Sequence, residues 1–144
     1  MIILKTEDEI EQIKISCLLV SDTLAYIATL LRPGISPKEL DNKAYEYIKD
    51  HKASPSFLNY RGFPASLCIS KNEVVVHGIP DDKALQDNDL VSVDCGVYFQ
   101  GFHGDSAYTF CLGEPEEAII KLCKITKESL YKGIDEAKVG NRIG

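Results

Sequence analysis

Two apolar stretches, residues 90–98 (LVSVDCGVY) and 102–110 (FHGDSAYTF), constrain the fold of this chain most. Their alternating pattern and short separation predict a β-hairpin. Each arm contains an aspartate, Asp94 in the first and Asp105 in the second. Side chains alternate between the two faces of a strand, and antiparallel partners share a face. A hairpin with an even-length turn therefore brings both carboxylates onto one face.

Two turns are compatible with this pattern. A turn at Phe99-Gln100 places Asp94 opposite Asp105, whereas a turn at Gln100-Gly101 places Asp94 opposite Ala107 with Asp105 diagonal to it. Like charges placed this close are destabilising. The carboxylates could point into water, one of them could be protonated, or a divalent cation could lie between them. The apolar neighbours of both residues argue against full solvation.

Composition limits the classes of protein to consider. The chain has 144 residues, with 44% hydrophobic and 26% charged residues, which fits one globular domain. Its net charge of −6 argues against a general nucleic-acid binder. No secretory signal pattern or obvious membrane span is evident. The five scattered cysteines lack a C-x-x-C pair and indicate a reduced, cytosolic setting.

Helix signals occur at three places. A capping box at residues 6–9 begins an apolar-periodic segment that should end at the proline and glycine of 32–34. A second capping box at 36–39 has proline in the first helical position. Residues 113–138 give a third helix with acidic residues in its first turn. The first and third helices each precede a glycine, at comparable positions.

Strand signals complete an α+β pattern in which helices cover an antiparallel sheet. Besides the hairpin, residues 65–70 (ASLCIS) and 73–77 (EVVVH) have the composition of short strands. Residues 55–64 and 78–89 contain turn and loop residues. No linker separates these segments, so residues 1–144 are treated as one domain.

An internal repeat is suggested by a shift of about 106 residues. The shift aligns identical residues at five pairs of positions: Glu11 with Glu117, Ile13 with Ile119, Cys17 with Cys123, Leu24 with Leu130, and Gly34 with Gly140. Two unrelated amphipathic helices that end in glycine could share such letters. If the duplication is real, a second copy begins near residue 114, and the chain carries the first half of a larger fold.

Two histidines are candidates for a role in catalysis or in ligand binding. His77 ends the run NEVVVHGIP, where it could cap a loop or donate a hydrogen bond or proton to a substrate. His103 precedes Asp105 by two residues and could be a second ligand, although a histidine hydrogen-bonded near the turn is the favoured interpretation. No phosphate-binding glycine loop and no G-x-S-x-G motif occurs.

Residues 59–82 (NYRGFPASLCISKNEVVVHGIPDD) and 89–110 (DLVSVDCGVYFQGFHGDSAYTF) resemble type I methionine aminopeptidases of the bacterial kind. The resemblance extends over essentially the whole chain. It implies the pita-bread fold, whose halves are related by a pseudo-twofold axis, with this chain as the first half. The repeat near residue 114 is what that symmetry implies.

The resemblance also implies a site. Two divalent ions (Co, Mn, Fe, Zn or Ni) would be bound, with Asp94 and Asp105 among their ligands. His77 would hydrogen-bond the substrate near the scissile nitrogen, and His103 would not bind metal. The methionine side chain would lie against three pocket residues, Tyr60, Phe63 and Cys68. A monovalent cation would bind backbone carbonyls near Asn72 and Val74.

The function that this resemblance implies is removal of the initiator methionine from new polypeptides with a small second residue. Such an enzyme is cytoplasmic, meets nascent N-termini at or near the ribosome, and needs neither membrane nor nucleic acid. Asn88 stands where the family usually has glycine, a mild change. One histidine and two glutamate ligands come from the family's second half, so the chain alone is expected to be inactive. An Xaa-Pro aminopeptidase and a non-catalytic peptide-binding protein are the alternatives.

Overall fold

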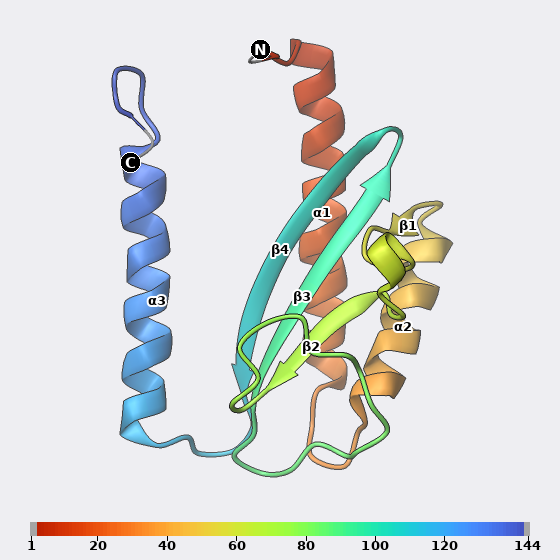
Figure 1. Cartoon of the computed structure of the whole chain (residues 1–144), viewed down its shortest axis with the longest axis vertical. Coiled ribbons are helices and arrows are strands. Elements are labelled where there is room, and N and C mark those ends of the chain that lie inside the picture. Colours follow the sequence, from red (N-terminus) through yellow and green to blue (C-terminus); the bar gives the residue numbers. More distant parts are fainter. Residues whose placement is uncertain (1–2, 143–144) are drawn as a thin grey trace. The chain divides into compact units, whose positions relative to one another are not determined.

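The computed structural model describes residues 3–142, which belong to two compact units, Met1–Gly113 and Glu114–Gly144. The first unit contains two helices and an antiparallel sheet, and the second contains one helix (Figure 1). In chain order the elements are α1 (Glu7–Leu30), α2 (Pro37–Asp50), β1 (Ser54–Pro55), the 3-10 turn η1 (Tyr60–Gly62), β2 (Leu67–Lys71), β3 (Leu90–Phe99), β4 (Phe102–Cys111) and α3 (Glu117–Glu136).

The helix starts follow the predicted capping residues. The Glu9 backbone N–H donates to the Thr6 hydroxyl at 3.2 Å, and the Thr6 backbone N–H donates to the Glu9 carboxylate at 2.8 Å. This reciprocal pair confirms the first capping box. At α2 the Ser36 hydroxyl accepts from the Glu39 N–H at 3.1 Å, and Pro37 is the first helical residue.

The sheet is built around β3. It pairs with β4 along its whole length on one edge, and with β2 and β1 on the other edge. Alternate β3 residues are fully buried on the face that the helices cover; they are Val91, Val93, Cys95 and Val97. α1 contacts β3 and β4, and α2 contacts β1 and β2, so both helices lie on the same side of the sheet (Figure 1).

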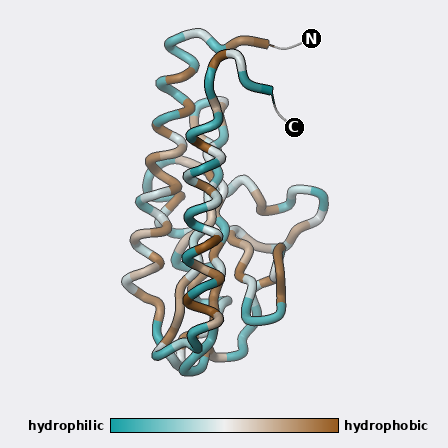
Figure 2. The backbone as a smooth tube through the Cα atoms, turned by 90° about the vertical axis from the view of Figure 1, so that its left-hand side faces the viewer, coloured by the Kyte–Doolittle hydropathy of each residue, from teal (hydrophilic) through white to brown (hydrophobic). Residues whose placement is uncertain are grey.

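The core lies between these two helices and the sheet. α1 is long and apolar enough, by length and composition, to span a membrane, with a mean hydropathy of 1.5. One face of this helix packs in the core of the first unit, because Val20 and Ile27 are almost completely buried. Apolar residues recur at intervals along the helices, as the hydropathy colouring shows (Figure 2). This periodicity is typical of helices that pack on one face.

The strand predicted at residues 73–77 is wrong. The chain leaves β2 after Lys71, and Asn72 adopts a left-handed conformation with φ of 54°. Val75 and Val76 are then 85% and 63% exposed and form no strand. β-branched residues favour a strand only where a neighbouring strand pairs with them, and within residues 3–142 this segment has no such neighbour. The short β1, by contrast, has no strand signal and was not predicted.

The second unit consists chiefly of α3. Its apolar side chains are exposed, among them Ile120, Leu122 and Leu130. The helix confirms the third helical prediction, with shorter ends than the sequence suggested. The duplication stays a prediction, because one helix of a second copy offers no sheet to compare with the first.

Asp41 supplies the first testable prediction. This aspartate of α2 is 4% exposed and accepts hydrogen bonds from the backbone N–H groups of Ser66 and Leu67 at 2.8 and 2.9 Å. We expect Asp41→Ala to lower the free energy of unfolding by about 3 kcal/mol, because two buried donors lose their acceptor. Urea unfolding followed by circular dichroism measures this change in the free energy of unfolding.

The matched control, Glu46→Ala, removes an exposed carboxylate from the same helix and should lower the free energy of unfolding by less than about 1 kcal/mol. Equal effects of the two substitutions would contradict the role given to Asp41.

Candidate metal and peptide site

The turn of the β3–β4 hairpin decides where the two aspartates lie. Gln100 and Gly101 form the turn, with φ of 48° and 93°. Two consecutive positive φ values are typical of the tight turns that match the twist of a hairpin. Asp94 therefore pairs with Ala107, and Asp105 pairs with Gly96. Of the two turns compatible with the sequence, the second is the one found.

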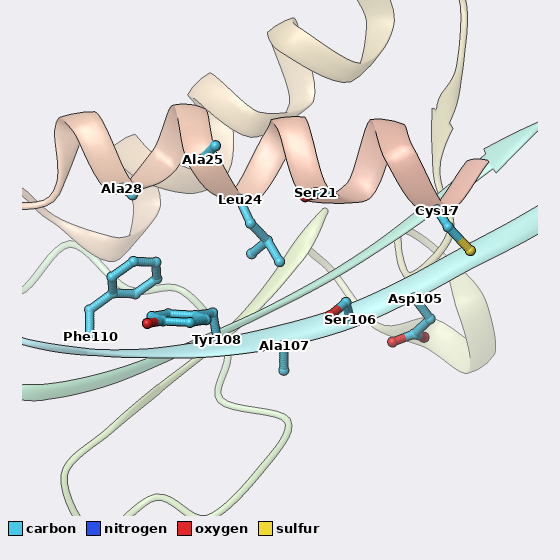
Figure 3. A pocket seen from close by; sticks show the side chains of 10 residues that line it. All are labelled: Cys17, Ser21, Leu24, Ala25, Ala28, Asp105, Ser106, Ala107, Tyr108 and Phe110. Atoms are coloured by element: carbon cyan, nitrogen blue, oxygen red, sulfur yellow. The ribbon is translucent and has the colours of Figure 1, made fainter. Parts of the chain in front are cut away.

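Asp94 and Asp105 project from the face of the sheet that the helices leave open. Figure 3 shows the alternation along β4: Asp105 and Ala107 point away from α1, whereas Tyr108 and Phe110 point toward it. The residues on the helical side line a groove between α1 and β4. The aspartates therefore belong to a surface separate from the core, as the period-two pattern predicted.

The two carboxylates affect one another electrostatically. Burial raises the pKa of Asp94, repulsion from the Asp105 carboxylate raises it further, and His77 partly offsets both effects. One carboxylate oxygen of Asp94, Oδ1, is buried and has no hydrogen-bond partner among the described residues. A buried oxygen without a donor, next to a second carboxylate, is a suitable environment for a divalent cation. The residues present therefore fit part of a metal site.

That metal site is incomplete in the described chain. Residues 3–142 contain no group of three or more histidine, cysteine, aspartate or glutamate side chains arranged to hold an ion. His103, which could have been a third ligand, instead forms a 2.8 Å hydrogen bond between its Nδ1 and the Ser56 hydroxyl. This confirms the interpretation of His103 as a hydrogen-bonded histidine near the turn.

One pocket, of about 570 Å³, brings together the residues that the sequence singled out. It lies in the first unit, on the open face of the sheet, and aromatic and small residues of 57–64 form one of its walls. The predicted site residues that line it are Tyr60, Phe63, Cys68, His77, Asp94 and Asp105. An apolar wall that faces two carboxylates and a histidine can hold an apolar side chain next to a reacting polar group.

Backbone contacts to β2 hold His77 in place. The Ile69 N–H donates to the Gly78 carbonyl at 2.9 Å, and the Gly78 N–H donates to the Ser70 hydroxyl at 3.1 Å. A Cβ at Gly78 would overlap the Ile69 carbonyl, so only glycine allows this approach. His77 itself is left-handed, with φ of 57°. The histidine is thus held by a loop docked on β2, and it does not lie at the end of a strand as predicted.

Cys68 lines the pocket beside Asp94, its partner in the β2–β3 register. Its side chain is 5% exposed. Burial, followed by the negative charges of Asp94 and Asp105, raises the pKa of Cys68 to about 11. The thiol is therefore protonated at neutral pH and contributes shape and apolar surface rather than a nucleophile.

Five residues that line the pocket were not identified as site residues from the sequence: Phe57, Arg61, Gly62, Pro64 and Ile79. Each lies within three residues of a predicted site residue, but no local pattern distinguishes it. At the predicted monovalent-cation position, the Asn72 side chain accepts from the Leu90 N–H at 2.9 Å and donates to Asp89 at 2.8 Å. The Val74 N–H donates to the Lys71 carbonyl at 3.0 Å. Asn72 thus braces the start of β3, and the cation stays a prediction.

Comparison with known proteins identifies the family of this chain. Metallopeptidase family M24 matches residues 11–144. The chain belongs to this family. The methionine aminopeptidase of Borreliella burgdorferi is 51% identical over 140 residues, which are 97% of this chain and 56% of that protein. This relative therefore aligns with almost the whole of this chain.

Solved structures extend the comparison to the fold. The methionine aminopeptidase of Thermotoga maritima superposes with a TM-score of 0.90 at 35% identity, over 96% of this chain and 55% of that one. The prolidase of Pyrococcus horikoshii superposes with a TM-score of 0.80 at 23% identity, over 94% of this chain and 38% of that one, a likeness of fold alone. The fold is thus the pita-bread fold, as predicted, and this chain spans about half the length of the relatives it matches.

Opposite pKa shifts at two aspartates give a second prediction. The raised pKa of Asp94 means that the metal-free folded protein holds more protons than the unfolded chain. This contribution to stability is complete below the unfolded pKa and is lost as the pH rises through the folded pKa. We therefore expect Asp94→Asn to become increasingly stabilising, relative to the unsubstituted chain, as the pH rises above about 4, the usual pKa of an aspartate.

Asp89 provides a control of opposite sign. Burial raises the pKa of Asp89, but hydrogen bonds from Gln86 and Asn72 and the charge of Lys71 outweigh burial and lower it overall. Its contribution is present above the unfolded pKa and is lost as the pH falls through the folded pKa. Asp89→Asn should destabilise most near neutral pH and least in acid. Urea unfolding at several pH values measures both trends, and parallel trends would contradict the electrostatic assignment.

Proposed function

We propose that this chain is the N-terminal part of a metal-dependent methionine aminopeptidase that removes the initiator methionine from new polypeptides with a small second residue. The observation that carries the proposal is the pocket in which Asp94, Asp105 and His77 face the apolar wall of Tyr60, Phe63 and Cys68. The names of the relatives that are 51% and 35% identical support the same activity. The nascent N-terminus is the proposed partner, met in the cytoplasm at or near the ribosome.

Asp94 and Asp105 are the residues that would hold the divalent ions, two in number by family resemblance. When bound, such ions supply an activated water and polarise the scissile carbonyl. The buried, unpartnered Oδ1 of Asp94 supports this role, because a cation would satisfy it. Cobalt, manganese, iron, zinc and nickel all remain candidates, since carboxylates alone do not distinguish them. A monovalent cation near Asn72 and Val74 is part of the same proposal.

The other pocket residues would position the substrate. Tyr60, Phe63 and the protonated Cys68 form a wall suited to an unbranched apolar side chain such as methionine. His77 would hydrogen-bond the substrate near its scissile nitrogen, from the fixed loop that follows β2. When a substrate is held at both ends in this way, its reaction becomes effectively intramolecular and therefore faster. One histidine and two glutamates from a second half of the fold would complete the metal ligands.

An Xaa-Pro peptidase is the second candidate, because the prolidase likeness shows that this fold also occurs among proline-specific enzymes. The relatives with 51% and 35% identity favour methionine instead. Release of methionine from Met-Ala-Ser, with no cleavage of a peptide carrying proline in the second position, separates the two activities. A non-catalytic peptide-binding protein would cleave neither peptide.

The activity can be tested in a chimera. This chain replaces the matching part of the Borreliella burgdorferi relative, which then supplies the remaining residues. We expect the chimera to release methionine from Met-Ala-Ser, and Asp105→Asn to reduce kcat/KM by more than about 100-fold, beyond the effect typical of residues that only orient a ligand. Bound metal, measured by mass spectrometry, should fall in parallel.

The control is Asp82→Asn, which changes an exposed aspartate outside the pocket and should alter neither kcat/KM nor bound metal. Full turnover by Asp105→Asn would refute the proposed role.

The chain alone should behave differently from the chimera. Two carboxylates give incomplete coordination, so we expect weak metal binding and no methionine release from residues 1–144. β4 pairs only with β3 in the described residues and presents an open edge, which favours self-association. Analytical ultracentrifugation and a peptidase assay with added manganese or cobalt test these expectations. A monomer with a sharp unfolding transition that also releases methionine would show that the chain needs no second half.

A further inference from the structure

An arginine occupies an unusual backbone position in the pocket wall. Between β1 and β2, three of four successive residues have positive φ: Asn59 at 66°, Arg61 at 50° and Gly62 at 83°. Glycine and asparagine adopt this left-handed region readily, whereas arginine does so only at a cost. A residue held in a sparsely populated conformation at a pocket suggests a use for its side chain.

The loop that carries Arg61 is firmly braced. The Asn59 N–H donates to the Phe63 carbonyl at 2.8 Å, and the Phe63 N–H donates to the Tyr60 carbonyl at 3.0 Å. At the start of the loop, the Ser56 N–H donates to the Gly96 carbonyl of β3 at 2.8 Å. The loop is therefore fixed to the strand that carries Asp94, and the position of Arg61 relative to the aspartates is set by the backbone.

The charge of Arg61 has no ion-pair partner among the described residues. Its guanidinium lies 5.4 Å from the centre of the Tyr60 ring, a cation–π contact that orients the side chain. Among residues 3–142, no carboxylate forms an ion pair with it. No other lysine or arginine lines the pocket. An exposed, oriented and unpaired cation at a peptide pocket is available to a negative group on the peptide.

We propose that Arg61 is a specificity residue that favours substrates with an acidic side chain at the third or fourth position. This inference rests on the proposed function. The methionine would occupy the wall that includes Tyr60 and Phe63, and the small second residue would lie at the reacting centre. The following residues leave the pocket, where they can reach an exposed guanidinium. Arginine matches a carboxylate with two parallel hydrogen bonds, which a neutral amide cannot reproduce.

The test compares matched peptides in the chimera described above. Met-Ala-Glu-Ser is compared with Met-Ala-Gln-Ser, and Met-Ala-Ser-Glu with Met-Ala-Ser-Gln, so that each pair differs only in charge. We expect kcat/KM to be about two- to fivefold higher for the glutamate peptide in at least one pair, the range typical of an exposed ion pair. The preference should decrease at high salt, because screening weakens exposed charges.

Three variants assign the preference to a residue. Arg61→Asn removes the charge and keeps a residue suited to the left-handed backbone, so the ratio of glutamate to glutamine peptides should fall to about one. Arg61→Lys keeps the charge without the planar fork and should retain part of the preference. Lys52→Asn is the control, because Lys52 is also exposed and left-handed, with φ of 60°, and lies outside the pocket. It should leave the ratio unchanged.

Two outcomes separate this inference from the proposed function. If no peptide releases methionine, the proposed function fails, and so does the specificity that depends on it. If the glutamine peptides are cleaved but neither pair shows a preference, or if Arg61→Asn and Lys52→Asn change the ratio equally, the inference about Arg61 is wrong and the proposed function stands. Binding of an uncleaved peptide with a D-methionine, measured by calorimetry, should show the same dependence on Arg61.

Discussion

The pairing register of the β3–β4 hairpin is the constraint on which the rest of the first unit depends. The turn at Gln100 and Gly101 sets this register, and each of the two residues has a positive φ. A slip of one residue would turn Asp105 toward α1 and Tyr108 toward the open face, because side chains on a strand alternate. The core would then contain a carboxylate, and the pocket would lose one. The turn therefore determines both the stability of the fold and the composition of the site.

The two faces of the β3–β4 hairpin differ in character: one face packs in the core, and the other carries the aspartates of the site. Valines of β3 are completely buried against the helices, whereas Asp94, one residue from Val93, has a buried oxygen with no partner. The raised pKa of Asp94 shows that the folded chain without metal opposes its negative charge. The surrounding structure must therefore be stable enough to hold this unfavourable group. Buried contacts such as those of Asp41 with β2, together with the valines, provide that stability.

Much of this architecture follows from local sequence patterns. Capping residues located the starts of α1 and α2, and period-two alternation identified the hairpin and the shared face of the aspartates. The choice between two even-length turns did not follow, because both satisfy the same alternation. The segment at Val74 to Val76 was mistaken for a strand because β-branched residues reveal nothing about whether a partner strand exists. Arg61 was missed for a related reason. Its left-handed conformation comes from the hydrogen bonds of the loop, and no local sequence pattern predicts those hydrogen bonds.

The buried thiol beside Asp94 has a consequence for chemical reactivity. Because burial and two neighbouring carboxylates raise the pKa of Cys68 to about 11, nearly all molecules carry the protonated thiol at pH 7 in the absence of a cation. Oxidants and alkylating agents react with the thiolate, so this cysteine should survive conditions that modify ordinary surface thiols. In the metal-free chain, an electrophilic group aimed at this sulfur would therefore react slowly. There the sulfur contributes to the shape of the pocket rather than to its reactivity.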